Sequence, residues 1–281
     1  MIAVCPNPYR DTDFSLTRQC LSLLHSAGFE TALCPVFAAP DDPIIPSDLP
    51  AQSMADVLSQ LTLAVVIGGD GTVLSVARTF NEAPVPILGI NLGTMGFMTS
   101  LEPEDAALIV KAARGEYRLS DRMKIDITLT HEGKVIYEGT ALNDAFIHGY
   151  GDSIILHAAC DGQTIISYSG DGIVLSTPTG STGYSLSAGG PIVEPETENI
   201  IVAPICAHTM CSRTFVLGKD RVVTVTAEKL HDRKAYLSVD GYVSADVNKD
   251  DVLTVKRSEY KVLFADLGAK SFYENTFEKL T

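Results

Sequence analysis

A carboxylate stands between glycines at the point where an apolar run gives way to a helical pattern. Residues 61–77 are LTLAVVIGGDGTVLSVA, with Asp70 inside the GGDGT run at 68–72. A glycine-rich turn between a parallel strand and a helix exposes backbone N–H groups at the positive end of the helix dipole, which favours phosphate oxygens. Glycines also let a phosphate chain approach without a clash against Cβ. The pattern therefore predicts an anion-binding turn.

The carboxylate of Asp70 narrows the chemistry of this turn. It would repel phosphate unless it binds a metal ion or accepts a proton from an attacking hydroxyl. The run matches neither the P-loop pattern GxxxxGK[ST] nor the dinucleotide pattern GxGxxG. Asp70 thus favours phosphoryl transfer, and the alternative is a tight strand-to-helix turn in which Asp70 caps the helix. The candidate phosphate-binding residues are Gly68, Gly69, Gly71 and Thr72.

A second polar segment lies about a hundred positions further along the chain. Residues 171–192 are DGIVLSTPTGSTGYSLSAGGPI, in which hydroxyls and glycines surround Tyr184. Short hydrogen-bond donors, an aromatic face and room for close backbone approach are what a nucleoside pocket requires. The alternative is a long loop of a β-sandwich whose Ser and Thr side chains satisfy their own turns.

Together these segments resemble the NAD kinase family. The family carries GGDGT, an Asn-Glu or Asn-Asp pair, and a long DG…STPTGSTAYSLSAGGPI segment, in that order. This chain has GGDGT at 68–72, Asn143-Asp144 within ALNDAFIH, and the long segment at 171–192. Residues 91–99 (NLGTMGFMT) and 204–213 (PICAHTMCSR) resemble two further family segments. GGDG alone also occurs in diacylglycerol-type lipid kinases and phosphofructokinases, so the long segment is the specific one.

The resemblance implies an activity and its reactants. The chain would transfer the γ-phosphoryl group of ATP, or of polyphosphate, to the adenosine ribose 2′-hydroxyl of NAD, which gives NADP. Asp70 matches the residue that accepts the proton of that hydroxyl. In-line transfer then requires positioning and charge neutralisation by a divalent metal cation, with Mg²⁺ expected. No residue is identified as a direct metal ligand.

The resemblance also implies an NAD site and a homo-oligomer. Asp171 matches an acidic residue on the nicotinamide side, and Tyr184 supplies an aromatic surface for the adenosine half. The family pattern is not matched everywhere, since Gly183 replaces a common Ala, Ser169 replaces an Arg, and Tyr242 replaces a common Gln. The implied assembly is a homodimer or homotetramer, and His208 receives no assigned role. The candidate NAD-binding residues are Asp70, Gly71, Phe97, Asn143, Asp144, Asp171, Thr182, Gly183, Tyr184 and Ser187.

The elements that position these residues follow two different periodicities. From 1 to 120, continuous apolar runs alternate with helical patterns, which predicts an open parallel α/β domain. Its predicted strands are 1–5, 31–37, 63–67 and 85–90. Its predicted helices are one with Leu16, Cys20, Leu21, Leu23 and Leu24 at helical spacing, one after GGDGT, and one over 104–114 with Pro103 and Gly115 at its ends.

From 121 to 265 the pattern alternates with period two, which predicts an antiparallel, β-sandwich-like domain. Glu132-Gly133 and Asp161-Gly162 read as hairpin turns. Residues 266–281, including the amphipathic SFYENTFEKL, are expected to return to the first domain. The apolar run 260–267 (YKVLFADL) resembles the α/β pattern of the first domain again. The predicted strands of the antiparallel domain are 123–130, 135–139, 141–148, 153–160, 163–168, 172–177, 221–227 and 251–256.

Composition narrows the function class further. The chain has 281 residues and a net charge of −14, from 21 basic against 35 acidic residues, which disfavours nucleic acid or an anionic membrane as partner. Its six cysteines form no Cys-x-x-Cys pair and are expected to be reduced, and a cytoplasmic protein without a membrane span is expected. Two rival functions stay open, a GGDG-type lipid kinase and a non-catalytic nucleotide sensor.

Overall fold

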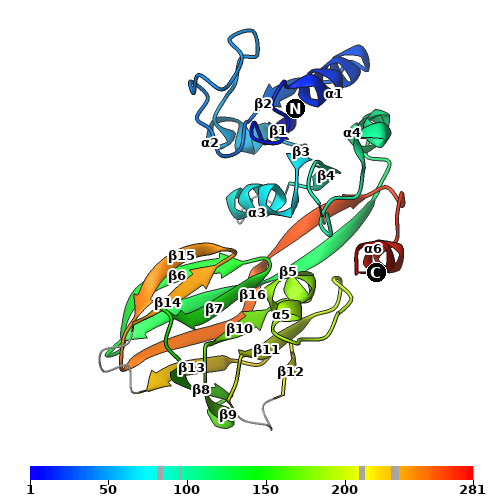
Figure 1. Ribbon diagram of the computed structural model, residues 1–281. Coiled ribbons are helices and arrows are strands. Elements are labelled where there is room, and N and C mark those ends of the chain that lie inside the picture. Colours follow the sequence, from blue (N-terminus) through cyan, green and yellow to red (C-terminus); the bar gives the residue numbers. More distant parts are fainter. Residues whose placement is uncertain (81–84, 95, 209–212, 229–233, 281) are drawn as a thin grey trace. The chain divides into compact units, whose positions relative to one another are not determined.

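The structure is a computed structural model that describes residues 1–80, 85–94, 96–208, 213–228 and 234–280. Cys211 and residues 209–212 of the family-like segment 204–213 lie outside these ranges. The chain divides into two compact units, Met1–Asp121 with Val262–Thr281 (unit 1) and Arg122–Lys261 (unit 2). It passes between the units within two long strands, β5 (Arg118–His131) and β16 (Asp251–Asp266) (Figure 1).

Unit 1 is the predicted open α/β arrangement on parallel strands. Its strand order is β2-β1-β3-β4-β16, and β1 pairs in parallel with both β2 and β3. Every residue of β1, β3 and β4 is buried, as expected where helices cover both faces of a parallel sheet. Besides β16, the strands are β1 (Ile2–Pro6), β2 (Thr31–Leu33), β3 (Leu63–Gly68) and β4 (Ile87–Asn91). The helices are α1 (Ser15–Ser26), α2 (Met54–Val57), α3 (Asp70–Thr79), α4 (Ile109–Ala113) and α6 (Phe272–Leu280), with 3-10 helices η1 (Leu58–Gln60) and η2 (Pro103–Leu108).

Two elements of unit 1 differ from the sequence prediction. The helix expected over 104–114 begins as the 3-10 helix η2 and becomes α-helical only in α4, a common form for a helix N-terminus. Gly115 ends it with a φ of +79°. The strand expected over 31–37 stops at Leu33, because Pro35 has no N–H for a strand ladder and Phe37 has a φ of +67°.

Unit 2 is the predicted antiparallel β-rich domain. A six-stranded sheet has the order β12-β11-β10-β7-β14-β15, and a second sheet contains β16, β13, β8 and β9, with β5 paired to β6 and β16. Alternate residues of both sheets form one core, including Ile147 and Leu175 from the first and Leu156 and Val225 from the second. The remaining strands are β6 (Lys134–Ala141), β7 (Asp144–Gly149), β8 (Ile154–Cys160), β9 (Gln163–Gly170), β10 (Gly172–Ser176), β11 (Asn199–Ile205), β12 (Phe215–Gly218), β13 (Val223–Glu228), β14 (Ala235–Val239) and β15 (Tyr242–Val247).

Sequence reasoning missed part of this sandwich. It did not include β11, β12, β14 or β15, although NIIVAPI at 199–205 has the apolar run of a buried strand. The runs 251–256 and 260–267 belong to one strand, β16. The strand expected over 141–148 is interrupted, because the N–H groups of Leu142 and Asn143 donate to the carboxylate of Asp240 rather than to a neighbouring strand.

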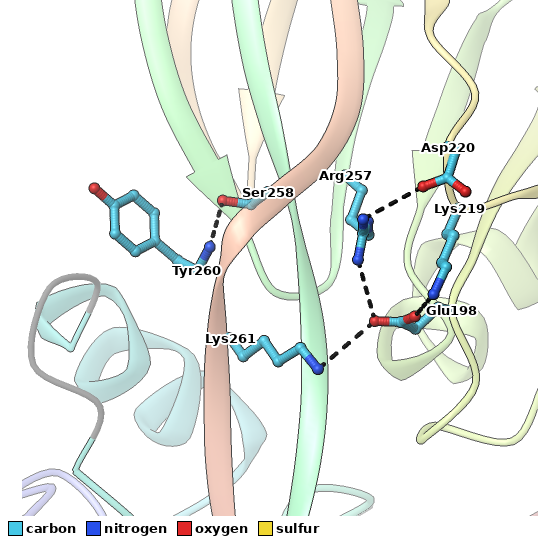
Figure 2. A network of polar contacts seen from close by, with 7 residues as sticks. All are labelled: Glu198, Lys219, Asp220, Arg257, Ser258, Tyr260 and Lys261. Carbon is cyan, nitrogen blue, oxygen red and sulfur yellow. Dashed lines mark hydrogen bonds and ion pairs between the residues drawn. The ribbon is translucent and has the colours of Figure 1, made fainter.

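A polar network joins the two sheets of unit 2 at one edge (Figure 2). The carboxylate of Glu198, just before β11, accepts a hydrogen bond from Nζ of Lys219 across 2.6 Å and lies 3.6 Å from a guanidinium nitrogen of Arg257 in β16. The hydrogen bond from Lys219 lowers the pKa of the Glu198 carboxyl. These cations are more than a third exposed, so solvent screens them and the network adds little stability. No candidate site residue belongs to it.

Candidate functional site

The GGDGT run forms the turn between the end of β3 and the start of α3. Gly68 ends β3, Gly69 is the N-terminal cap in an extended conformation, and α3 begins at Asp70. The first N–H groups of a helix have no partner inside the helix, and they stand at the positive end of its dipole. The turn therefore has the local geometry that the sequence predicts for binding an anion.

The space available for a side chain differs among the glycines in and near this turn. A Cβ on Gly68 would lie 2.4 Å from Oγ1 of Thr72, so the turn itself requires that glycine. A Cβ on Gly93 would lie 3.1 Å from Cα of Gly69, so this pair marks a close backbone approach. A Cβ on Gly71 would meet nothing within 4 Å. Ala is a better helix former than Gly, and the packing of the chain would allow an Ala at position 71. The packing therefore does not explain why this position is a glycine, and the free space beside it suits a ligand.

The carboxylate of Asp70 binds a neighbouring segment rather than the end of its own helix. Oδ2 accepts a hydrogen bond from the N–H of Phe97 at 3.0 Å, and Oδ1 accepts one from the N–H of Met98 at 2.9 Å. No side chain caps the N-terminus of α3, so the alternative of a helix-capping Asp70 is wrong. Each oxygen keeps a lone pair for a further partner, such as the hydrogen of a hydroxyl.

Two asparagines that the sequence analysis missed support this turn. Nδ2 of Asn7 donates to Oγ1 of Thr72 at 3.0 Å, and Oδ1 of Asn91 accepts from the N–H of Gly93 at 2.9 Å. Asn7 follows β1, and Asn91 ends β4. Ligands of open α/β sheets bind at the carboxyl ends of the strands, so polar residues directly after apolar runs were the signal that could have found them.

In unit 2, Asp240 organises the Asn143-Asp144 pair. Its carboxylate accepts hydrogen bonds from the N–H groups of Leu142, Asn143 and Asp144 at 2.9, 2.8 and 3.2 Å. Asp240 lies in the turn between β14 and β15 with a φ of +47°, followed by Gly241 at +82°. Sequence reasoning assigned no role to Asp240, although an Asp-Gly turn was visible.

Two buried acids of unit 2, Asp144 and Asp240, have shifted pKa values. Burial, and then the nearby Asp240 carboxyl, raises the pKa of Asp144 to about 7. Burial also raises the pKa of Asp240, but the three N–H donors and the charge of Lys124 oppose that change. Asp240 is therefore the better stabilised carboxylate of the two, and Asp144 takes up a proton first as the pH falls.

The segment 177–192 is not an irregular loop, since it forms a 3-10 helix η3 (Thr179–Thr182) and a short helix α5 (Tyr184–Ser187). It is packed tightly on the Asn143-Asp144 pair. A Cβ on Gly180 would lie 2.2 Å from the carbonyl oxygen of Asn143, and one on Gly183 would lie 3.6 Å from Nδ2 of Asn143 and 3.8 Å from Oδ2 of Asp144. Gly183 thus faces both polar side chains of the pair.

Several polar atoms of this region are buried without a protein partner. Among the residues that the structure describes, Oδ1 of Asn143, Oγ1 of Thr179 and Oγ of Ser185 are buried and accept or donate no hydrogen bond. Buried polar groups are normally hydrogen-bonded, and exceptions call for an unseen partner. Three such atoms lie on and beside the predicted nucleoside-binding segment, inside its packed interior.

Tyr184 lies on an aromatic surface of the six-stranded sheet. Its ring packs edge-to-face on Phe146 at 4.9 Å between centroids, and Phe146 lies 6.0 Å from the ring of Tyr236. Burial raises the pKa of the Tyr184 phenol, with smaller contributions from Tyr236, Cys206, Asp171 and Asp144. The charges of Asp171 and Asp144 thus act on the Tyr184 phenol.

Asp171 is held between two glycines that leave no room for side chains. A Cβ on Gly170 would lie 2.8 Å from the carbonyl oxygen of Ile205, and one on Gly172 would lie 2.3 Å from that of Ile147. The Asp171 carboxylate accepts a hydrogen bond from the thiol of Cys206, which raises the pKa of that thiol. Thr182 is half-buried, and Ser187 and Tyr242 are exposed.

Within unit 1 the structure brings together GGDGT and Phe97, which is half-buried. Within unit 2 it brings together Asn143, Asp144 and Gly183, while Asp171 lies between β9 and β10. The described residues contain no group of three or more His, Cys, Asp or Glu side chains arranged to hold a metal ion. His208 contributes a backbone N–H to the carbonyl oxygen of Ser169.

The fold is that of solved NAD and NADH kinases. A structure of yeast NADH kinase in complex with NADH superposes with a TM-score of 0.85, 23% identity and coverage of 99% of this chain and 86% of that one. A structure of an NAD kinase from Archaeoglobus fulgidus in complex with ATP superposes with a TM-score of 0.76, 26% identity and coverage of 100% and 98%. The fold thus places the chain in the structural class of these kinases.

Sequence comparison gives the family. Residues 51–116 match the family model of the ATP-NAD kinase N-terminal domain, and residues 142–267 match that of the C-terminal domain. The NAD kinase of Acetivibrio thermocellus is 34% identical over 97% of this chain and 94% of its own length, and that of Geotalea daltonii is 36% identical over 80% of each. The chain belongs to the NAD kinase family.

Proposed function

We propose that this chain transfers the γ-phosphoryl group of ATP to the 2′-hydroxyl of the adenosine ribose of NAD, which gives NADP. The observation that carries the proposal is the Asp70 carboxylate, which two backbone N–H groups fix at the start of α3. Its free lone pairs accept the proton of the attacking hydroxyl, while the N–H groups at the start of α3 bind phosphate oxygens beside Gly71.

The residues of unit 2 bind NAD in this proposal. Asn143 and Asp144 supply an amide and a carboxyl to the nucleoside, and Tyr184 offers its ring to the adenine. Asp171 lies toward the nicotinamide, and Thr182, Gly183 and Ser187 line the segment that holds the adenosine half. Phe97 contributes an apolar surface. The close approach of Gly183 to the side chains of Asn143 and Asp144 supports this assignment, because it joins the pair to the segment 182–187.

A divalent cation enters the reaction with the nucleotide. The described residues show no cluster that would hold a resident metal ion, so the donor set does not fit a permanent metal site. We infer that Mg²⁺ arrives bound to the phosphates of ATP and reduces their charge, which is its usual role in phosphoryl transfer. Magnesium is thus part of the substrate.

A direct assay tests the proposed function. Purified protein is incubated with NAD, ATP and MgCl₂, and NADP is measured with an NADP-specific coupling dehydrogenase. NADP formation that depends on both NAD and ATP is expected, and its absence in properly folded protein would favour a nucleotide sensor. Polyphosphate in place of ATP, and NADH in place of NAD, define the donor and acceptor ranges in the same assay.

The comparisons support neither alternative, a lipid kinase or a sensor, since the relatives are NAD kinases over most of the chain. No helix among the described residues is long and apolar enough to cross a membrane. Vesicle binding that accompanies lipid phosphorylation would reopen the first alternative.

We also propose a cytoplasmic homo-oligomer, a dimer or a tetramer. The described cysteines, Cys5, Cys20, Cys34, Cys160 and Cys206, are all free thiols, as in a reducing compartment. β15 forms one edge of the six-stranded sheet and carries Val243, a residue that is 65% exposed. Apolar side chains on a sheet edge favour association with another chain. Light scattering coupled to size-exclusion chromatography gives the oligomer mass.

A further inference from the structure

The C-terminal helix reaches the segment that fixes Asp70. Lys279 lies in the last turn of α6, and its Nζ donates a hydrogen bond to the carbonyl oxygen of Gly96 at 2.8 Å. The same ammonium lies 5.9 Å from the ring centroid of Phe97. All of these residues belong to unit 1, so the contact lies inside one compact unit.

One peptide group connects Lys279 to Asp70. The carbonyl of Gly96 accepts from Lys279, and the N–H on the same peptide bond, that of Phe97, donates to Oδ2 of Asp70 at 3.0 Å. Hydrogen bonds in such a chain polarise one another, so a cation on the carbonyl strengthens the N–H as a donor. The ammonium of Lys279 thereby acts on the carboxylate through a planar peptide unit.

The backbone turn at Gly96 is tight, and the ammonium of Lys279 packs against it. Gly96 has a φ of +57°, a conformation that other residues adopt only at a cost. A Cβ there would lie 2.6 Å from Oγ1 of Thr99 and 2.8 Å from Nζ of Lys279, so the ammonium takes up the space that a side chain would need. A charged hydrogen bond at this turn is suited to keep the next two N–H groups aimed at Asp70.

The surroundings of Lys279 explain why α6 holds this position. Its start is set by a capping box, in which the N–H of Ser271 donates to Glu274 and the N–H of Glu274 donates to Oγ of Ser271. The charged groups that face Lys279 are Asp70, Glu102 and Glu278, which favour its charged form, and Lys270, which opposes it. Partial burial lowers the pKa of Lys279.

We propose that Lys279 is a positioning residue of the phosphoryl-transfer site, which holds the Gly96–Phe97 peptide so that its N–H keeps the Asp70 carboxylate oriented. This role rests on the proposed NAD kinase function. It differs from binding ATP or NAD directly, because Lys279 acts through the peptide group. Preorganised groups of this kind lower the barrier of the chemical step more than they strengthen substrate binding.

The test uses three substitutions with separate effects. Lys279→Met removes both donor and charge but keeps an apolar stem over Phe97, Lys279→Gln keeps a neutral donor, and Lys279→Arg keeps both. Lys270→Met is the matched control, because Lys270 is an exposed cation beside the same helix whose Nζ binds Glu278 at 2.8 Å.

The expected result is a loss of kcat. The free energy of a charged hydrogen bond corresponds to a factor of about 10 to 100 in rate. The kcat of Lys279→Met should therefore fall by that factor, while the KM values for ATP and NAD stay nearly constant. Lys279→Gln should be intermediate, Lys279→Arg should recover most of the rate, and Lys270→Met should match the unmodified chain. Unchanged kcat with a raised KM for ATP would overturn the proposal in favour of a direct phosphate contact.

A second measurement is independent of turnover. Amide hydrogen exchange at Phe97 and Met98 in the ligand-free protein should accelerate by about 10-fold or more in Lys279→Met and stay unchanged in Lys270→Met. Equal protection in both variants would overturn the proposal. If the unmodified chain makes no NADP, the proposed function fails, while this exchange comparison still decides whether Lys279 holds the Asp70 segment.

Discussion

Oδ2 of Asp70 accepts the backbone N–H of Phe97, which lies 27 positions further along the chain, at 3.0 Å. The contact joins the start of α3 to the segment that follows β4. It fixes a carboxylate at the end of a helix whose N–H groups suit phosphate. A carboxylate and the first N–H groups of a helix thus lie side by side, as the proposed role of Asp70 as proton acceptor requires.

The substitution Asp70→Asn should remove most of the turnover. An amide cannot accept the hydroxyl proton, and its NH₂ group would face one of the N–H donors of Phe97 and Met98. We expect kcat to fall by at least about 100-fold while NAD affinity, measured by calorimetry, stays close to that of the unmodified chain. Asp161→Asn is the control, since its carboxylate also accepts a backbone N–H but lies in the turn between β8 and β9. Near-normal turnover in Asp70→Asn would contradict the role of proton acceptor.

Two glycine substitutions should separate folding from catalysis. Gly68→Ala places a Cβ against Thr72 and should cost about 1 to 3 kcal/mol of unfolding free energy. Gly71→Ala meets no atom of the chain and should leave stability unchanged or raise it by up to about 1 kcal/mol. If phosphates pass beside Gly71, Gly71→Ala should nevertheless raise the KM for ATP. Thermal unfolding and steady-state kinetics on both variants check this, and an unaffected KM would place the phosphates elsewhere.

The unfolding free energy should depend on pH through the titration of Asp144. Its pKa is about 7 in the folded chain against 3.8 as reference, so the native state binds more protons between these values. The stability that this group contributes is complete below pH 3.8 and is lost as the pH rises through 7, with a slope of at most about 1.4 kcal/mol per pH unit.

Asp144→Asn should flatten that part of the stability curve in ligand-free protein. Asp240 keeps a slope of the same sign, because its pKa is also raised. Asp161→Asn should leave the slope in place, since the N–H of Val222 and the Arg221 side chain lower the pKa of Asp161. Chemical denaturation at a series of pH values measures the unfolding free energy of the unmodified chain, Asp144→Asn and Asp161→Asn. An identical slope in Asp144→Asn and the unmodified chain would show that Asp144 does not titrate in this range.

The ring of Tyr184 should matter to NAD and its hydroxyl should not. Stacking of a base on an aromatic side chain contributes about 1 to 3 kcal/mol, so Tyr184→Ala should weaken NAD binding by that amount. Tyr184→Phe keeps the edge-to-face contact with Phe146 and should bind NAD normally. Equal affinities of Tyr184→Ala and Tyr184→Phe would remove Tyr184 from the site.

Chelation should stop the reaction without affecting the fold. EDTA removes Mg²⁺ from ATP, so NADP formation should cease and return when excess MgCl₂ is added. If the cation binds only together with the phosphates of ATP, as proposed, the melting temperature of the nucleotide-free protein should not change. A lower melting temperature in EDTA would instead reveal a resident metal.

Much of the fold class could be predicted from local pattern. Continuous apolar runs around helical segments predicted the parallel sheet of unit 1, and period-two alternation predicted the antiparallel sandwich of unit 2. These predictions were possible because a strand buried on both faces is apolar throughout, whereas a strand buried on one face alternates apolar and polar residues. Strands β12, β14 and β15 were missed because short or partly exposed strands carry a weak signal. Helix η2 was predicted as α-helical, since periodicity separates the two helix types poorly.

The sequence by itself determined the chemistry-bearing residue types, their order along the chain and the family they resemble. It placed Asp70 between glycines and Tyr184 among hydroxyls, because those patterns are local. Only the tertiary structure decided what holds them. Asp240 lies 97 positions from Asn143, and Lys279 lies 183 positions from Gly96, yet each pair is joined by a hydrogen bond. Partners that far apart meet only when the sheets and the final helix have folded, so no local pattern could reveal them.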